Sequence, residues 1–135
     1  MPTLYLGWHN QNLLHMTTQE VADQLVNLCR KGKNMEAIET LYGEDIHSIE
    51  PVGEEPEAKG LEAIKGKAAY FDKSMEVHSV RISDPVVADD HFSISYYMDA
   101  TNQENGERHD MSEIAVYQVK DGKIVKEQFF YSWPG

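Results

Sequence analysis

The spacing of apolar residues changes once along the chain, from a helical period before Met75 to a two-residue alternation after it. Before the change, apolar residues three and four positions apart predict helices at 17–31, 35–42 and 61–75. The first of these helices opens on the capping-box sequence TTQE and is followed by Gly32, a residue typical of helix ends. The first half of the chain is therefore predicted to be mainly helical.

In the second half, apolar residues occupy every second position, as in the run 92–99, which is typical of strands with one buried face. The dipeptides NG at 105–106 and DG at 121–122 predict hairpin turns between such strands. The predicted strands are 76–83, 92–99, a run through Met111 and Tyr117, and 124–133, with an earlier strand at 45–50. Helices followed by a meander predict an α+β domain with an antiparallel sheet that helices cover on one face.

Length and charge narrow the classes of function. The chain has 135 residues, enough for one domain, and a formal net charge of -11. Such an acidic chain is not expected to bind nucleic acid or an anionic membrane, because neither offers positive charge. The single cysteine, Cys29, lies in a helical pattern and has no disulfide partner in the chain, which favours a cytoplasmic location.

The first sixteen residues differ in composition from the rest, since they contain no Asp, Glu, Lys or Arg. They carry no basic start and no sustained apolar run, so we do not expect them to be a signal peptide. We expect residues 1–16 to be an appended segment and residues 17–135 to form the single domain.

Glu50 is the leading candidate for acid–base chemistry, because it ends a predicted strand directly before Pro51. Ile46, Ser48 and Glu50 share one face of that strand, so Glu50 faces the core if Ile46 does. A carboxylate that faces a core is either paired or has a raised pKa. The alternative is an exposed glutamate at the edge of an acidic loop.

Three segments of the chain are informative in combination: EAIETLY at 36–42, EPVGEEP at 50–56 and YQVKDGKIV at 117–125. In this order they resemble the NTF2-like superfamily, which includes ketosteroid isomerases, SnoaL-type polyketide cyclases and other SnoaL-like proteins. The resemblance runs from about Thr17 to the end of the chain. It implies a cone-shaped, cystatin-like α+β fold whose curved antiparallel sheet wraps around the N-terminal helices and encloses a hydrophobic pocket.

In ketosteroid isomerases an aspartate base precedes a similar Pro-Val-Gly segment, and Glu50 falls on its position. Those enzymes also use a tyrosine and a protonated aspartate to stabilise the oxyanion. The corresponding positions here are near Val26 and on Ala115, whose side chains donate no hydrogen bond. Because such donors are often worth about 100- to 1000-fold in rate, the resemblance implies a pocket but not the classical ketosteroid isomerase reaction.

Strand alternation predicts which polar groups meet in that pocket. If Ala115 and Tyr117 face the helices, Glu113 does too. The same argument gives the candidate catalytic residues Glu50, His78 and Glu113, and the candidate ligand-binding residues Tyr96, Met98, Tyr117, Glu127, Phe129 and Tyr131. Two alternatives stay open: Glu113 and Glu127 lie on the solvated face if the register is opposite, and His78 is a structural histidine.

No metal or other cofactor is expected. His109 and Glu113, four residues apart on a strand, are separated by roughly 13 Å, too far to chelate one ion. The chain also lacks a glycine-rich phosphate loop and a G-x-S-x-G elbow.

The leading hypothesis is a SnoaL-like protein that takes a small hydrophobic or carbonyl-bearing molecule. If catalytic, it would be a cofactor-independent isomerase, cyclase or lyase, with Glu50 as general base and His78 or Glu113 as the polarising group. The alternative is a non-catalytic ligand-binding or dimerisation module. In either case we expect a homodimer through the outer sheet face, which offers the apolar side chains of Tyr97, Ile114, Val116 and Phe130.

Overall fold

The computed structural model describes residues 15–132, so most of the predicted appended segment 1–16 lies outside the described residues. The described helices are α2 (Thr18–Arg30), α3 (Asn34–Leu41) and α4 (Leu61–Ser74). The described strands are β1 (Tyr42–Ile49), β2 (Glu57–Lys59), β3 (Met75–Ile82), β4 (Val86–Ala88), β5 (His91–Asn102), β6 (Arg108–Lys120) and β7 (Lys123–Phe130). Helix and strand regions follow the predicted change of period at Met75.

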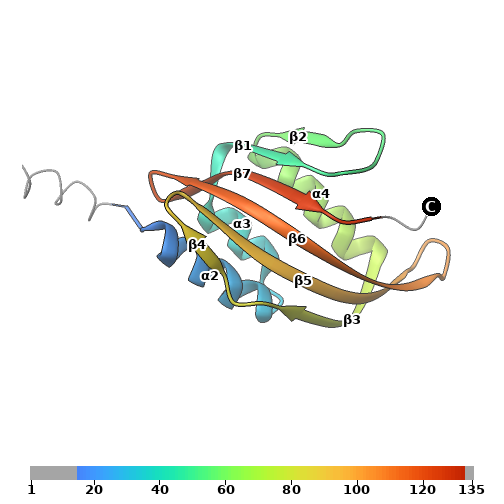
Figure 1. Cartoon of the computed structure of the whole chain (residues 1–135). Helices are drawn as coiled ribbons and strands as arrows, with labels where there is room; N and C mark the ends of the chain where they lie inside the picture. Colours follow the sequence, from blue (N-terminus) through green and yellow to red (C-terminus); the bar gives the residue numbers. More distant parts are fainter. Residues whose placement is uncertain (1–14, 133–135) are drawn as a thin grey trace, which may run out of the picture.

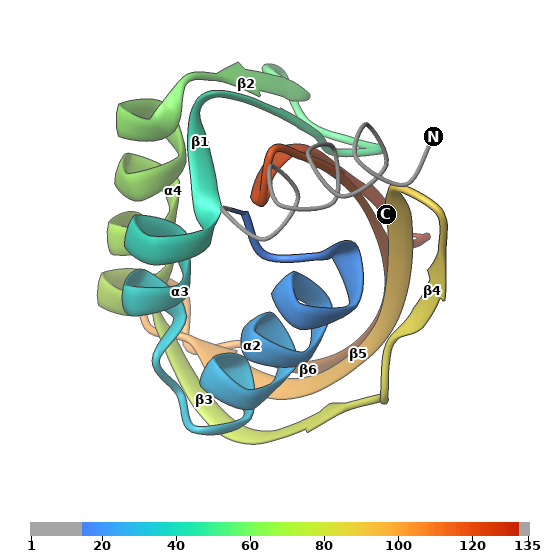
Figure 2. The same ribbon diagram turned by 90° about the vertical axis from the view of Figure 1, so that its left-hand side faces the viewer.

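One curved sheet forms the body of the molecule, with strand order β2-β1-β7-β6-β5-β3 and β4 paired to β5. Figure 1 shows the long strands β5, β6 and β7 side by side with the helices behind them. Viewed from the end, the sheet bends around α2, while α3 and α4 close the remaining side (Figure 2). The predicted α+β cone is confirmed.

The sheet is mixed and not wholly antiparallel, because β1 pairs in parallel with β7. After β1 the chain passes through β2 and α4 to the far edge of the sheet, and the meander from β3 brings β7 back beside β1. A sequence pattern that marks strands singly does not show this pairing. The short strands β2 and β4 were not predicted either.

The core lies between α2 and the concave face of the sheet, which we define as the face that carries Ile94 and Tyr117. α2 begins at the predicted capping box, in which Thr17 and Glu20 bond each other's backbone amides. Six of the seven residues predicted to share the core are buried: Leu25, Ile38, Leu41, Ile64, Ile94 and Tyr117. The seventh, Phe71, is only half-buried.

One end of the concave face, which we call the open end, carries the exposed apolar side chains of Val77 and Val80. Val77 and Val80 on β3 lie opposite Ala100 and Met98 on β5, and therefore point to the concave side. Even so, their exposed fractions are 42% and 44%. Apolar side chains thus remain accessible at this end of the cone.

No helix within residues 15–132 has the length and apolar character needed to cross a membrane.

Candidate functional site

Three glutamates come together on the concave face near its open end. Glu127 on β7 lies opposite Ser48 on β1 and Tyr117 on β6. Glu113 lies four residues before Tyr117 on β6 and therefore on the same face of that strand. Glu50 is the residue directly after β1. The electrostatic interactions among the three carboxylates confirm that they are neighbours. The sequence left two orientations open for Glu113 and Glu127, and in the structure both side chains lie on the concave face.

Glu127 is the deepest of the three and is 5% exposed. Tyr42 Oη donates a hydrogen bond to one carboxylate oxygen, and Ser48 Oγ donates to the other over 2.9 Å. Burial nevertheless raises the pKa of Glu127, although both hydrogen bonds act to lower it. Tyr42 was predicted to end a helix but instead opens β1, so the sequence pattern missed this partner.

Glu50 lies nearer the surface, with 25% of its side chain exposed. Lys67 Nζ on α4 lies 3.2 Å from Glu50 Oε1, and Tyr131 Oη donates to Oε2 over 2.9 Å. Of the two alternatives for a carboxylate that faces the core, Glu50 thus has the first, because it is paired with Lys67 and Tyr131. Lys67 was not among the predicted site residues, since a helix position gives no sequence signal for a contact with a distant strand end.

Glu113 is half-buried and makes no hydrogen bond or ion pair with any residue of 15–132. Burial raises its pKa to about 7, with additional contributions from the Glu50 and Glu127 charges and a smaller opposing effect of Lys67. Near neutral pH the Glu113 carboxyl is thus divided between its acid and its base form. That is the behaviour expected of a proton-transfer group.

The wall beside Glu113 is apolar. Met111 precedes Glu113 on the same face of β6 and pairs with Met98, which in turn pairs with Val80. Met98 and Met111 are half-buried and lie outside the main core cluster. The row formed by Val80, Met98 and Met111 therefore gives the carboxylates an apolar border that is open to solvent.

The predicted ligand-binding residues divide into two groups. Tyr117 is buried, stacks on Phe92 at 4.7 Å between ring centroids, and shares a hydrogen bond of 2.8 Å with Tyr96 Oη. Burial raises the pKa of both tyrosines, so they stay protonated. The first group, Tyr96, Tyr117 and the half-buried Phe129, belongs to the core or packs on it; the second, Met98, Glu127 and Tyr131, lines or supports the carboxylate cluster.

His78 does not lie with the carboxylates, contrary to the predicted placement. The register of β3 against β5 shifts between Val77 and Ser79, and this bulge moves His78 off the concave face that alternation from Val80 would give it. His78 is exposed and hydrogen bonds to Thr101 Oγ1 over 2.7 Å. The structure therefore supports its alternative reading as a structural histidine.

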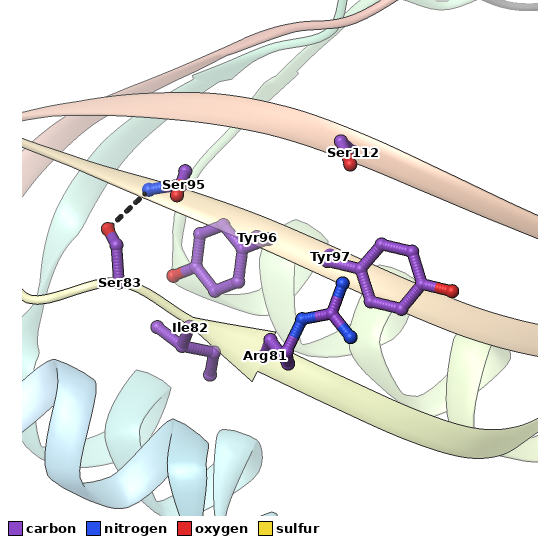
Figure 3. Close-up of a pocket in the computed structure, with 7 residues that line it drawn as sticks. All are labelled: Arg81, Ile82, Ser83, Ser95, Tyr96, Tyr97 and Ser112. Atoms are coloured by element: carbon purple, nitrogen blue, oxygen red, sulfur yellow. Dashed lines mark hydrogen bonds between the residues drawn. The ribbon is translucent and has the colours of Figure 1, made fainter.

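Two hollows lie on the outer face of the sheet, away from the three glutamates. The larger, of about 420 Å³, contains Arg81, whose guanidinium carbon lies 4.0 Å from the centroid of the Tyr97 ring (Figure 3). The smaller, of about 310 Å³, is lined by Tyr97, Asp99, Arg108, His109 and Asp110. Among the predicted ligand-binding residues, only Tyr96 borders either hollow. Neither one contributes to the carboxylate site.

Across residues 15–132, no group of three or more His, Cys, Asp or Glu side chains has the arrangement needed to hold a metal ion.

Cys29 lies against the core near Tyr96, and burial raises the pKa of its thiol to about 11. A thiol with such a pKa is a poor nucleophile at neutral pH. The candidate proton-transfer groups of the site are therefore its carboxyls.

Comparisons with known proteins agree with this architecture. The model of the SnoaL-like domain family matches residues 16–131. A Mesorhizobium loti protein described as a SnoaL-like polyketide cyclase is 35% identical, with a TM-score of 0.83 over 86% of this chain and 100% of its own. The chain belongs to the SnoaL-like domain family, and the resemblance to the NTF2-like superfamily is confirmed.

More distant solved structures share the fold. A Pseudomonas putida protein described as a polyketide cyclase is 16% identical, with a TM-score of 0.69 over 87% of this chain and 92% of its own. A Catenulispora acidiphila protein with a ketosteroid isomerase-like fold, solved in complex with trimethylamine, has 23% identity and a TM-score of 0.67, with coverage of 84% and 85%. No curated protein matches this chain.

Proposed function

We propose that this member of the SnoaL-like family binds a small apolar carbonyl compound at the open end of its concave face and transfers a proton on it without a cofactor. Glu50 is the general base and Glu113 the general acid. The observation that carries the proposal is the combination of two neighbouring carboxyls: Glu50 is held beside Lys67, and Glu113, which has no hydrogen bond or ion pair within residues 15–132, has a pKa of about 7. Two neighbouring carboxyls in different environments are suited to opposite roles.

The apolar row of Val80, Met98 and Met111 supports the choice of substrate class. Side chains of this kind bind hydrocarbon surface and provide no partner for a highly charged molecule. Three glutamates beside one lysine also make the site unfavourable for substrates that carry several negative charges. A neutral molecule with a carbonyl group and an acidic neighbouring C–H bond suits both properties.

In the proposed reaction, ionised Glu50 removes the proton next to the carbonyl, and the C–H electron pair becomes the double bond of an enolate or enol. Protonated Glu113 donates a hydrogen bond or its proton to the carbonyl oxygen. Return of a proton from Glu50 to the same or another carbon completes an exchange or an isomerisation, and where Glu113 gave up its proton, the enol O–H returns a proton to Glu113 as the carbonyl re-forms. Atoms and charge balance without an oxidant or a reductant.

The test is deuterium exchange at the α-carbon of 2-tetralone, an apolar ketone, in D₂O. Proton NMR follows the loss of the α-proton signal. We expect wild-type protein to accelerate the exchange and Glu50→Gln to abolish the acceleration, because an amide is not a base. Glu54→Gln, in the exposed loop that follows, is the matched control and should behave as wild type. Equal exchange in wild type and Glu50→Gln would refute the proposed base.

The second candidate function is that of a non-catalytic ligand-binding module. The bonds from Lys67 and Tyr131 to Glu50 favour it, since they satisfy the Glu50 carboxylate without any reaction. Saturable binding of 2-tetralone without acceleration of exchange would support this candidate over the enzyme.

A homodimer through the outer sheet face is also part of the proposal. Ile114 and Phe130 lie opposite each other on β6 and β7, with exposed fractions of 52% and 49%. Large apolar side chains side by side on a sheet face are typical of an interface. The cytoplasmic location stays a prediction.

A further inference from the structure

Lys67 brings an ammonium group to the site from the helix side. Within residues 15–132 it is the one cation whose charge acts on Glu50, Glu113 and Glu127 together. Its Nζ lies 3.2 Å from Glu50 Oε1, and 44% of its side chain is exposed. Lys67 thus contacts the proposed base while retaining room to move.

The proposed reaction creates negative charge on the substrate oxygen, and the interior of the cone offers little to stabilise it. Val26 and Ala115, at the positions of the isomerase oxyanion donors, are both buried and carry no donor. Tyr42 and Tyr117 direct their hydroxyls to Glu127 and Tyr96. Besides the Glu113 carboxyl, the cation near the site within residues 15–132 is the Lys67 ammonium, which has three N–H bonds and so keeps donors beyond the one directed to Glu50.

We propose that Lys67 is the oxyanion-stabilising residue of this site, and that it transfers its ion pair from Glu50 to the substrate oxygen as Glu50 takes up the proton. The inference rests on the proposed function. When Glu50 becomes neutral, its attraction for the ammonium falls; at the same moment the negative charge appears on the enolate oxygen. Lys67 therefore keeps its positive charge throughout, while its anionic partner changes from Glu50 to the enolate oxygen.

Mobility of the lysine makes this exchange possible. A lysine ammonium is a compact charge on a flexible four-carbon stem, so it shifts between neighbouring anions without a change in the helix. Lys65 on the same helix is the natural control, because its Nζ lies 3.8 Å from Glu39 and from Glu62, both outside the site. The two lysines share α4 but differ in the carboxylates they contact.

The test measures binding of 4-nitrophenolate, whose phenolic oxygen carries the charge of an enolate and whose visible absorbance reports ionisation. Glu50→Gln protein is the background, because glutamine imitates the protonated base and leaves Lys67 without its anionic partner. We expect an added Lys67→Met change to weaken phenolate binding roughly 10- to 100-fold, the range for loss of one charged hydrogen bond. Lys67→Arg should retain most of the affinity, and Lys65→Met all of it.

Equal phenolate affinity with and without Lys67→Met would overturn the inference, and so would the absence of phenolate binding to Glu50→Gln protein. Repeating the comparison with Glu50→Ala guards against a folding defect in the first background. Failure here is separable from failure of the proposed function, because wild-type exchange of 2-tetralone does not depend on the phenolate measurement.

Discussion

Replacing Glu113 with glutamine should change how stability depends on pH. In the folded wild type Glu113 has a pKa of about 7, whereas the pKa of an unperturbed glutamate is 4.5. The folded state therefore binds more protons than the unfolded chain between these values, and the contribution of Glu113 to stability falls as pH rises through this window. Glu113→Gln removes the titrating group and with it this dependence.

The magnitude follows from the two pKa values. Linkage between 4.5 and about 7 gives a loss of roughly 2 kcal/mol in wild-type stability between pH 5.5 and pH 8 that glutamine does not show. Solvent contact of the half-buried carboxyl makes this an upper value. At pH 8 the Glu113→Gln protein should therefore gain stability relative to wild type, because glutamine avoids a buried negative charge beside those of Glu50 and Glu127.

Urea unfolding of both proteins at several pH values from 5.5 to 8 is the assay. The difference in unfolding free energy between the two proteins isolates Glu113, because the other carboxylates are common to both. The lower limit stays above the sequence pI of about 4.8, where solubility is poorest. Parallel pH profiles for the two proteins would refute a raised pKa at Glu113.

Three further outcomes are expected. Tyr42→Phe removes one of the two hydrogen bonds to buried Glu127 and should destabilise the protein by about 1–3 kcal/mol in urea unfolding; an unchanged midpoint would show that the bond contributes nothing. Ile114→Asp should convert a micromolar homodimer to a monomer in light scattering, and a monomeric wild type would contradict the proposed interface. Leu41→Ala, at a fully buried position, should cost about 2–5 kcal/mol by calorimetry or urea, and a cost near zero would contradict the described core.

Periodicity was sufficient to predict the helices and the main strands, but it left both registers of Glu113 open. Ala115 and Tyr117 share a face with Glu113, and no irregularity interrupts β6 between them. The same reasoning failed for His78, because a single bulge reverses the alternation and leaves no mark in the composition of the strand.

Contacts between distant elements could not be predicted in this way. Lys67 reaches Glu50 across α4 and β1, and Tyr42 reaches Glu127 across 85 positions of sequence. Both contacts depend on how helices and strands pack, which single-element patterns do not contain. The parallel pairing of β1 with β7 went unpredicted for the same reason.

Methionine methyl NMR with 2-tetralone tests most directly whether the ligand binds at the open end of the concave face. Met98 and Met111 line that end, whereas Met16 packs at the opposite end, near Gly122. We expect added 2-tetralone to shift the ¹³C-methyl signals of Met98 and Met111 and to leave that of Met16 in place. Unchanged Met98 and Met111 signals at saturating 2-tetralone would contradict it.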